Sequence, residues 1–107
     1  MGKIFINQDV LKIELTYDSL PSAVEHAWIK YRSPGSDEDK TFPTEATHNI
    51  ASSSFSIVFA VGETLSDYGV SGTWKFWLWL ELTDGRVIPG EVISEKIYEE
   101  GRGYAVV

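Results

Sequence analysis

Two histidines, His26 and His48, are the side chains of this sequence best suited to act as a base near neutral pH. Nucleophilic catalysis needs a nucleophile and a base within hydrogen-bond reach, and usually a third group that orients the base. His26 falls on the solvent-facing side of a predicted strand, and His48 lies beside a polar loop. The sequence has neither a G-x-S-x-G nor an H-E-x-x-H motif. We therefore expect two surface histidines and no enzyme activity.

Three consecutive acidic residues, Asp37, Glu38 and Asp39, form a second group that could do chemistry. Paired carboxylates can hydrolyse glycosidic bonds, and carboxylate oxygens can bind Ca²⁺. The three follow a Ser-Pro-Gly-Ser turn, lack the spacing of an EF-hand, and are expected to form a solvated loop, with a weak Ca²⁺ site as the alternative. The segment 69–72 lacks the lysine and the following helix of a phosphate-binding loop. We expect no cofactor and no catalytic or metal site.

The tryptophans are more informative than the titratable residues. In the segment 73–82, alternate positions from Trp74 to Leu82 are apolar, which predicts a long strand with one buried face. The pleat then sends Trp77 and Trp79 to the opposite face, where they are neighbours. The alternation of residues 23–32 places Trp28 outward as well.

Asp84-Gly85 between two strand patterns predicts a hairpin, because glycine accepts the positive φ that tight turns require. With a two-residue loop, Trp77 would lie opposite Val92, and Glu81 opposite Ile88. An exposed apolar patch on a soluble domain usually marks an interaction surface, and tryptophan is enriched in binding hot spots. The interface candidates are therefore Trp77, Trp79, Ile88, Val92 and Trp28. The alternatives are that other parts of the chain cover the indoles, or that they form a sugar-stacking platform.

Strict alternation recurs along the chain. Leu11, Ile13, Leu15 and Tyr17 share one face of a strand, and residues 55–61 repeat the pattern up to Val61. A weak edge strand is expected around 41–46, one helical turn within 64–68, and a bulge or sheet edge at Pro89-Gly90. About seven strands at even spacing predict an all-β, immunoglobulin-like antiparallel β-sandwich over residues 1–98, followed by a flexible tail at 99–107.

Charge and composition exclude several classes of function. The formal net charge of −7 disfavours nucleic acid and anionic membranes as partners. With no cysteine, neither a disulfide nor a Cys-ligated zinc site can form. The short apolar run near the N-terminus does not fit a signal peptide, so synthesis in the cytoplasm is expected.

Several segments together resemble the small Ig-like structural proteins of tailed phages. They are Gly72-Thr73-Trp74 with the alternating strand that follows, Asp84-Gly85, Gly90-Glu91 with a closing strand, Ile29-Lys30-Tyr31-Arg32-Ser33-Pro34-Gly35, and Thr41-Phe42-Pro43-Thr44. The resemblance covers most of residues 2–98. Trp77 and Trp79 depart from it, because relatives often carry Gln and Tyr there.

The resemblance implies a virion protein, of the type found as N-terminal domains of baseplate and receptor-binding-apparatus proteins. We accordingly expect a non-enzymatic structural or assembly protein of a tail, baseplate or capsid. Its expected partners are further copies of itself, as a homo-oligomer, or other virion proteins. A carbohydrate-binding module that uses exposed tryptophans is the alternative.

Overall fold

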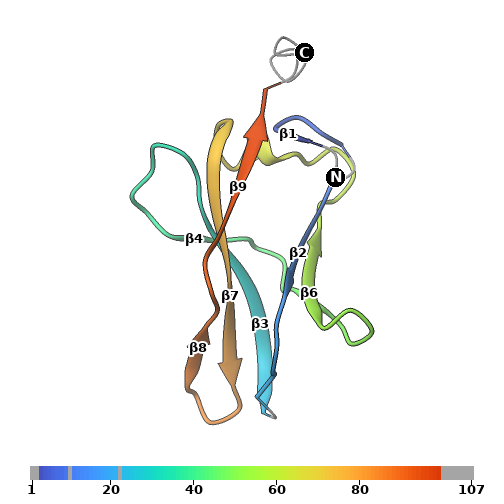
Figure 1. Ribbon diagram of the computed structural model, residues 1–107, viewed down its shortest axis with the longest axis vertical. Coiled ribbons are helices and arrows are strands. Elements are labelled where there is room, and N and C mark those ends of the chain that lie inside the picture. Colours follow the sequence, from blue (N-terminus) through green and yellow to red (C-terminus); the bar gives the residue numbers. More distant parts are fainter. Residues whose placement is uncertain (1–2, 10, 22, 100–107) are drawn as a thin grey trace.

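The structure is a computed structural model that describes residues 3–9, 11–21 and 23–99 (Figure 1). Its strands form two sheets, and the described residues contain no α-helix. The larger sheet has the spatial order β1 (Ile4–Phe5), β9 (Ile93–Tyr98), β7 (Gly72–Leu82), β3 (Val24–Arg32) and β4 (Lys40–Thr41), with β8 (Val87–Pro89) also paired to β7. The smaller sheet has the order β2 (Lys12–Thr16), β6 (Ser54–Val58) and β5 (Thr47–Asn49). The predicted all-β class is thus confirmed.

The sheet pairing differs from the prediction in one respect. We expected antiparallel sheets, but β1 runs parallel to β9, with Ile4 opposite Ile97 and Phe5 opposite Tyr98. The larger sheet is therefore mixed. The other strand pairs, including the long β3–β7 pair at its centre, are antiparallel.

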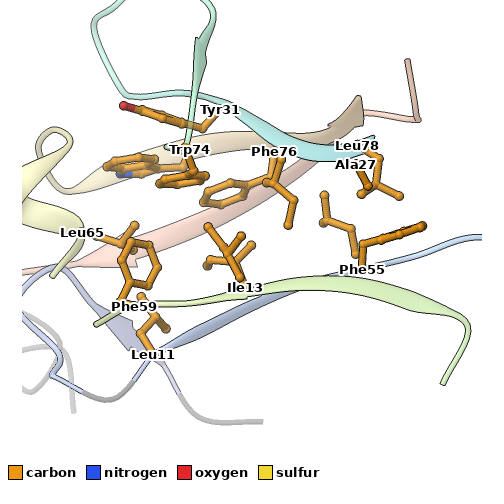
Figure 2. Packing of buried hydrophobic residues seen from close by; sticks show 14 of the residues in the cluster. Leu11, Ile13, Ala27, Tyr31, Phe55, Phe59, Leu65, Trp74, Phe76 and Leu78 are labelled. Carbon is orange, nitrogen blue, oxygen red and sulfur yellow. The ribbon is translucent and has the colours of Figure 1, made fainter. Parts of the chain in front are cut away.

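The core lies between the inward faces of the two sheets (Figure 2). The alternation expected for β2, β3 and β7 is confirmed, because one face of each strand is buried. Trp74 is fully buried, stacks beside Tyr31 with ring centroids 5.6 Å apart, and donates its indole N–H to the carbonyl oxygen of Val70 at 2.7 Å. A buried indole usually finds such a partner, because an unpaired N–H is costly away from water.

Outside the central strands, one expectation is corrected and one strand was not predicted. Val61 was placed on the buried face of its strand, but β6 ends at Val58 and Val61 is fully exposed in the turn that follows. Residues 47–49 form the short strand β5, which pairs with β6 although its sequence, Thr-His-Asn, carries no apolar alternation. The expected helical turn is confirmed as a 3₁₀ turn, η1, at Leu65–Asp67.

The hairpin after β7 has a three-residue loop, not the two-residue loop predicted. Leu82 N donates to Arg86 O at 2.8 Å, and Gly85 takes a positive φ of 89° within the loop. A three-residue loop ending in a left-handed residue is the next commonest hairpin connection. The longer loop moves the partner strand by one residue relative to β7.

The expected irregularity at Pro89-Gly90 is confirmed as a bulge that separates β8 from β9. Trp79 pairs with Pro89 and Phe76 with Ile93, so the returning strand uses one residue more than β7 over the same stretch. The predicted tail, residues 99–107, lies outside the described residues apart from Glu99.

Candidate interaction surface on the outer face of β3 and β7

The candidate site is the face of the larger sheet that points away from the core, called here the outer face. It is made by alternate residues of β3 and β7, the two central strands. Their register sets out the opposed pairs of this face as His26 with Glu81, Trp28 with Trp79, Lys30 with Trp77, and Arg32 with Lys75.

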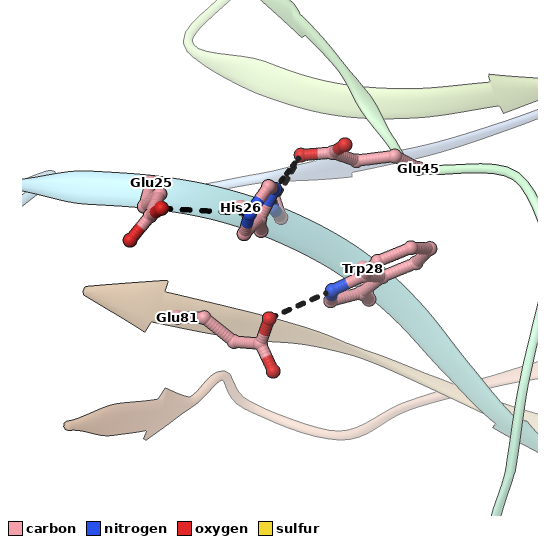
Figure 3. Close-up of polar contacts among 6 residues, drawn as sticks. Glu25, His26, Trp28, Glu45 and Glu81 are labelled. Carbon is pink, nitrogen blue, oxygen red and sulfur yellow. Dashed lines mark hydrogen bonds and ion pairs between the residues drawn. The ribbon is translucent and has the colours of Figure 1, made fainter. Parts of the chain in front are cut away.

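Trp28 and Trp79 lie directly opposite each other, and both are partly exposed. The indole N–H of Trp28 donates to Oε1 of Glu81 at 3.1 Å (Figure 3). Lys30 Nζ lies 4.1 Å from the ring centroid of Trp79, within the range of a cation–π interaction. Each indole is therefore held by a charged neighbour while part of its ring faces solvent.

A shallow cleft of about 370 Å³ lies beside the two indoles. Its walls combine aromatic rings with polar and charged groups, and its lining residues are Trp28, Lys30, Thr41, Phe42, Pro43, Trp79 and Glu81. An apolar floor with a few placed polar groups is typical of binding sites. The segment 41–43, expected only as a weak edge strand, thus forms one wall of the cleft.

Trp77 does not belong to the accessible surface, which corrects the idea that Trp77 and Trp79 form an exposed pair. It is on the outer face, as predicted, but only 8% of it is exposed. Strand β7 has β3 on one side and β8 and β9 on the other, so long side chains on both flanks can shield an indole at its centre. The accessible pair is Trp28 with Trp79, which the strand alternation alone could not place side by side.

The other two interface candidates, Ile88 and Val92, lie on opposite faces of the larger sheet. Because of the three-residue loop, Ile88 pairs with Leu80 instead of Glu81, which turns it away from the outer face toward the space between the sheets. Pro89 takes the place opposite Trp79. Val92 shares the parity of Ser94, which lies opposite Lys75, so it is on the outer face and is 52% exposed.

His26 lies on the same face among carboxylates, at the end of β3 nearest Glu81 (Figure 3). Its Nδ1 is 3.0 Å from Oε1 of Glu45, and its Nε2 is 3.7 Å from Oε1 of Glu25. The hydrogen bond to Glu45 raises the pKa of His26, and the charges of Glu45, Glu25 and Glu81 act in the same direction. The prediction that His26 faces solvent is confirmed, and its partners make it a polar border of the surface.

His48 and the acidic residues 37–39 do not line the cleft beside Trp28 and Trp79. His48 stacks on Phe55, with ring centroids 4.5 Å apart, in the smaller sheet. Asp39 accepts hydrogen bonds from the guanidinium of Arg32, an ion pair on the surface. Within residues 3–9, 11–21 and 23–99, no three His, Asp or Glu side chains gather in a way that could hold a metal ion.

The polar groups that hold the indoles are the part that sequence reasoning missed. Lys30 and Glu81 were assigned outward by alternation, but nothing in one sequence showed which strand lies beside β7. The outward positions of residues 24–32 mix Trp, Lys and Arg, and those of β7 mix Trp, Lys and Glu, but this likeness of composition does not show that the two strands are neighbours.

Comparison with protein family models, with curated proteins and with solved structures finds no match to this chain. In the part of the chain that the structure describes, no helix has the length and apolar character needed to cross a membrane.

Proposed function

We propose that this chain is a non-enzymatic structural or assembly protein of a tailed-phage virion that acts through protein–protein contacts on its outer face. Its partners are further copies of itself or other virion proteins, and it is made in the host cytoplasm before it is incorporated. The assignment to a virion rests on the resemblance in residues 2–98. The assignment to binding rests on the outer face.

The fold belongs to the same proposal, as an immunoglobulin-like sandwich. The strand order β1-β9-β7-β3-β4 against β2-β6-β5 supports it, because Ig domains oppose a sheet built on strands G, F and C to one containing B, E and D. In that scheme β2, β3, β6, β7 and β9 correspond to B, C, E, F and G. With no cysteine in the chain, side chains such as Ile13 and Phe76 would fill the space between the sheets.

The binding proposal rests on one observation: Trp28 and Trp79 lie side by side, and a charged neighbour holds each ring. Indoles at an interface bury a large area while losing little side-chain entropy, and those already fixed by neighbours lose less still. Glu81 and Lys30 fix these two rings before any partner binds. On a face that met only water, two large apolar rings held in fixed orientations would contribute only the modest stability of a cross-strand aromatic pair.

Light scattering tests the self-association arm of the proposal on the purified chain. We expect a mass above that of the monomer, and Trp28→Ala and Trp79→Ala should each weaken association while far-ultraviolet circular dichroism stays unchanged. Val58→Ala, which removes an exposed apolar side chain from the other sheet, is the matched control.

If the chain is monomeric, electron microscopy of its native assembly tests whether it binds other virion proteins. Absence of the chain from any particle would overturn the virion assignment.

Carbohydrate binding is the second candidate, and the composition of the cleft favours it. Thr41, Lys30 and Glu81 could hydrogen-bond sugar hydroxyls beside the faces of the two indoles. Quenching of tryptophan fluorescence by a glycan, lost in Trp79→Ala, would support this reading. No binding across a broad glycan array would exclude it.

A further inference from the structure

A second surface, separate from the outer face, lies where the two sheets open between β2 and the β8–β9 segment. It is a groove of about 580 Å³, and apolar side chains from both sheets form its floor: Leu15, Leu78, Leu80, Ile88 and Ile93. Ile88 and Ile93 are 37% and 40% exposed. The bulge between β8 and β9 matters here, because it keeps both isoleucines on the core-facing side across a shift in register.

One wall of the groove is a strand edge able to accept another strand. Phe59 N donates to Leu11 O, and Tyr17 N donates to Ser53 O, so odd-numbered residues of β2 face β6. In an antiparallel pair the alternate residues point their backbone groups away. The N–H and C=O groups of Lys12, Glu14 and Thr16 are therefore directed to the side on which the described residues supply no strand.

The opposite wall is less suited to pairing. Directly after β8, the N–H of Gly90 donates to Leu78 O at 2.7 Å. Because backbone groups alternate in direction along an antiparallel strand, Pro89, the neighbouring residue, directs its backbone to the free side. Proline has no N–H to donate, and it is a common protection of edge strands. An extended segment entering the groove would thus extend the sheet of β2 and pack its side chains on Ile88 and Ile93.

We propose that the groove binds residues 102–107 of a second copy of this chain, added as a strand at the edge of β2. The segment reads Arg-Gly-Tyr-Ala-Val-Val, in which Tyr104 and Val106 share one parity and suit the apolar floor. Six extended residues span about 20 Å, enough to cover the five residues of β2. Main-chain pairing would provide affinity, and the alternate side chains would provide specificity.

Charge complementarity supports this occupant. The groove is bordered by Glu14, Asp18 and Glu91, and no Lys, Arg or His is among the described residues that line it. Glu14 is already paired with Lys12 at 3.1 Å, which lowers the pKa of Glu14 and leaves Asp18 and Glu91 as the sites for an incoming cation. The segment 102–107 contains Arg102 and no acidic side chain. Arg102 shares the parity of Tyr104 and Val106, so it would meet a carboxylate only at the end of the groove, beyond the apolar floor.

The direction of β9 favours a second copy over the same chain. β9 starts at Ile93, beside the groove, and runs away from it to Tyr98 at the other end of the molecule (Figure 1). There β1 is paired to its edge, and Ile6 N donates to Tyr98 O at 2.8 Å. A segment following β9 would have to pass β1 to reach its own groove. It meets the groove of another copy without that detour, in a head-to-tail contact that gives rings or filaments.

Sedimentation velocity on the full chain tests the inference. Ile88→Lys places a charge on the groove floor. We expect association to shift to at least about tenfold higher concentration, which corresponds to a loss of about 1.4 kcal/mol of binding free energy. Val61→Lys adds the same charge at a fully exposed position and should leave association unchanged. The double variant Tyr104→Asp/Val106→Asp, which alters only the incoming segment, should behave like Ile88→Lys. A parent chain that stays monomeric at every concentration would overturn the inference. So would association of both Ile88→Lys and Tyr104→Asp/Val106→Asp at the same concentration as the parent chain.

A peptide experiment separates this contact from the outer-face contact. The Tyr104→Asp/Val106→Asp chain should bind a labelled peptide of residues 100–107 in fluorescence anisotropy. Adding Ile88→Lys should abolish that binding, and adding Trp79→Ala should not change it. Binding that depends on Trp79 and not on Ile88 would assign the peptide to the outer face and contradict the groove.

Discussion

The two faces of β7 carry three tryptophans in six residues and use them differently. On the inner face, Trp74 is fully buried and its N–H is bonded to the backbone of Val70. On the outer face, Trp77 is almost buried, whereas Trp79 keeps a partly exposed ring under Lys30. The same residue type thus ranges from a core side chain to a candidate binding side chain along one strand. Alternation decides the face, but the neighbouring strands decide the exposure.

Trp74→Ala should have the largest effect and should act on stability alone. Removing a fully buried indole from a packed core costs roughly 3–5 kcal/mol. We expect chemical denaturation to show a loss of that order or an unfolded chain. A loss below about 1 kcal/mol would contradict the inner-face role of Trp74.

Trp77→Ala should cost less than Trp74→Ala, roughly 2–3 kcal/mol, because its indole lies at the sheet surface where water can fill the space it leaves. The free energy of unfolding from urea titration measures this. Trp77→Phe, which keeps an aromatic ring on the outer face, is the control and should recover most of the loss. Destabilisation as small as that of Trp79→Ala would mean that Trp77 is not shielded by its neighbours.

Trp79→Ala should change stability by about 1 kcal/mol or less, the value of one exposed cation–π contact. Its main effect should fall on association, measured by light scattering on the folded variant. Lys30→Gln keeps the ring but removes the cation that covers it, and should give a smaller loss of association. Equal and large losses of stability in Trp74→Ala and Trp79→Ala would remove the distinction between the two faces.

His26 should give the smallest effect, a weak dependence of stability on pH at the border of the outer face. Its folded pKa is raised above the ordinary 6.5 by the hydrogen bond to Glu45. The stabilisation is therefore complete below about pH 6.5 and is lost as pH rises through the raised folded value. Titration of the His26 ring signals by nuclear magnetic resonance measures this pKa, which Glu45→Gln should lower. An unchanged pKa in Glu45→Gln would show that Glu45 is not the cause.

Much of the inner face could be predicted from the sequence, because a period of two is a local property. This period predicts the buried faces of β2, β3 and β7, and buried residues such as Leu11, Ile29 and Leu82 confirm it. The hairpin position was also readable from Asp84-Gly85. The all-β class followed from the number of such segments.

The outer face could not be predicted to the same depth, because it depends on register and on strand order. One residue more in the loop after Leu82 moved Ile88 from the outer face to the groove. The pairing of Trp28 with Trp79 needs the knowledge that β3 lies beside β7. The strand β5 was missed because backbone pairing with β6, and not apolar burial, defines it.

Hydroxyl-radical footprinting of the chain, free and within the virion assembly that we propose for it, tests the role of the outer face most directly. We predict that oxidation of Trp28 and Trp79 falls severalfold on assembly, while Trp74 is protected in both states and labelling of the exposed Ile50, in the turn after β5, stays the same. Equal oxidation of Trp28 and Trp79 in the free and assembled chain would contradict the assignment of the outer face as the interaction surface.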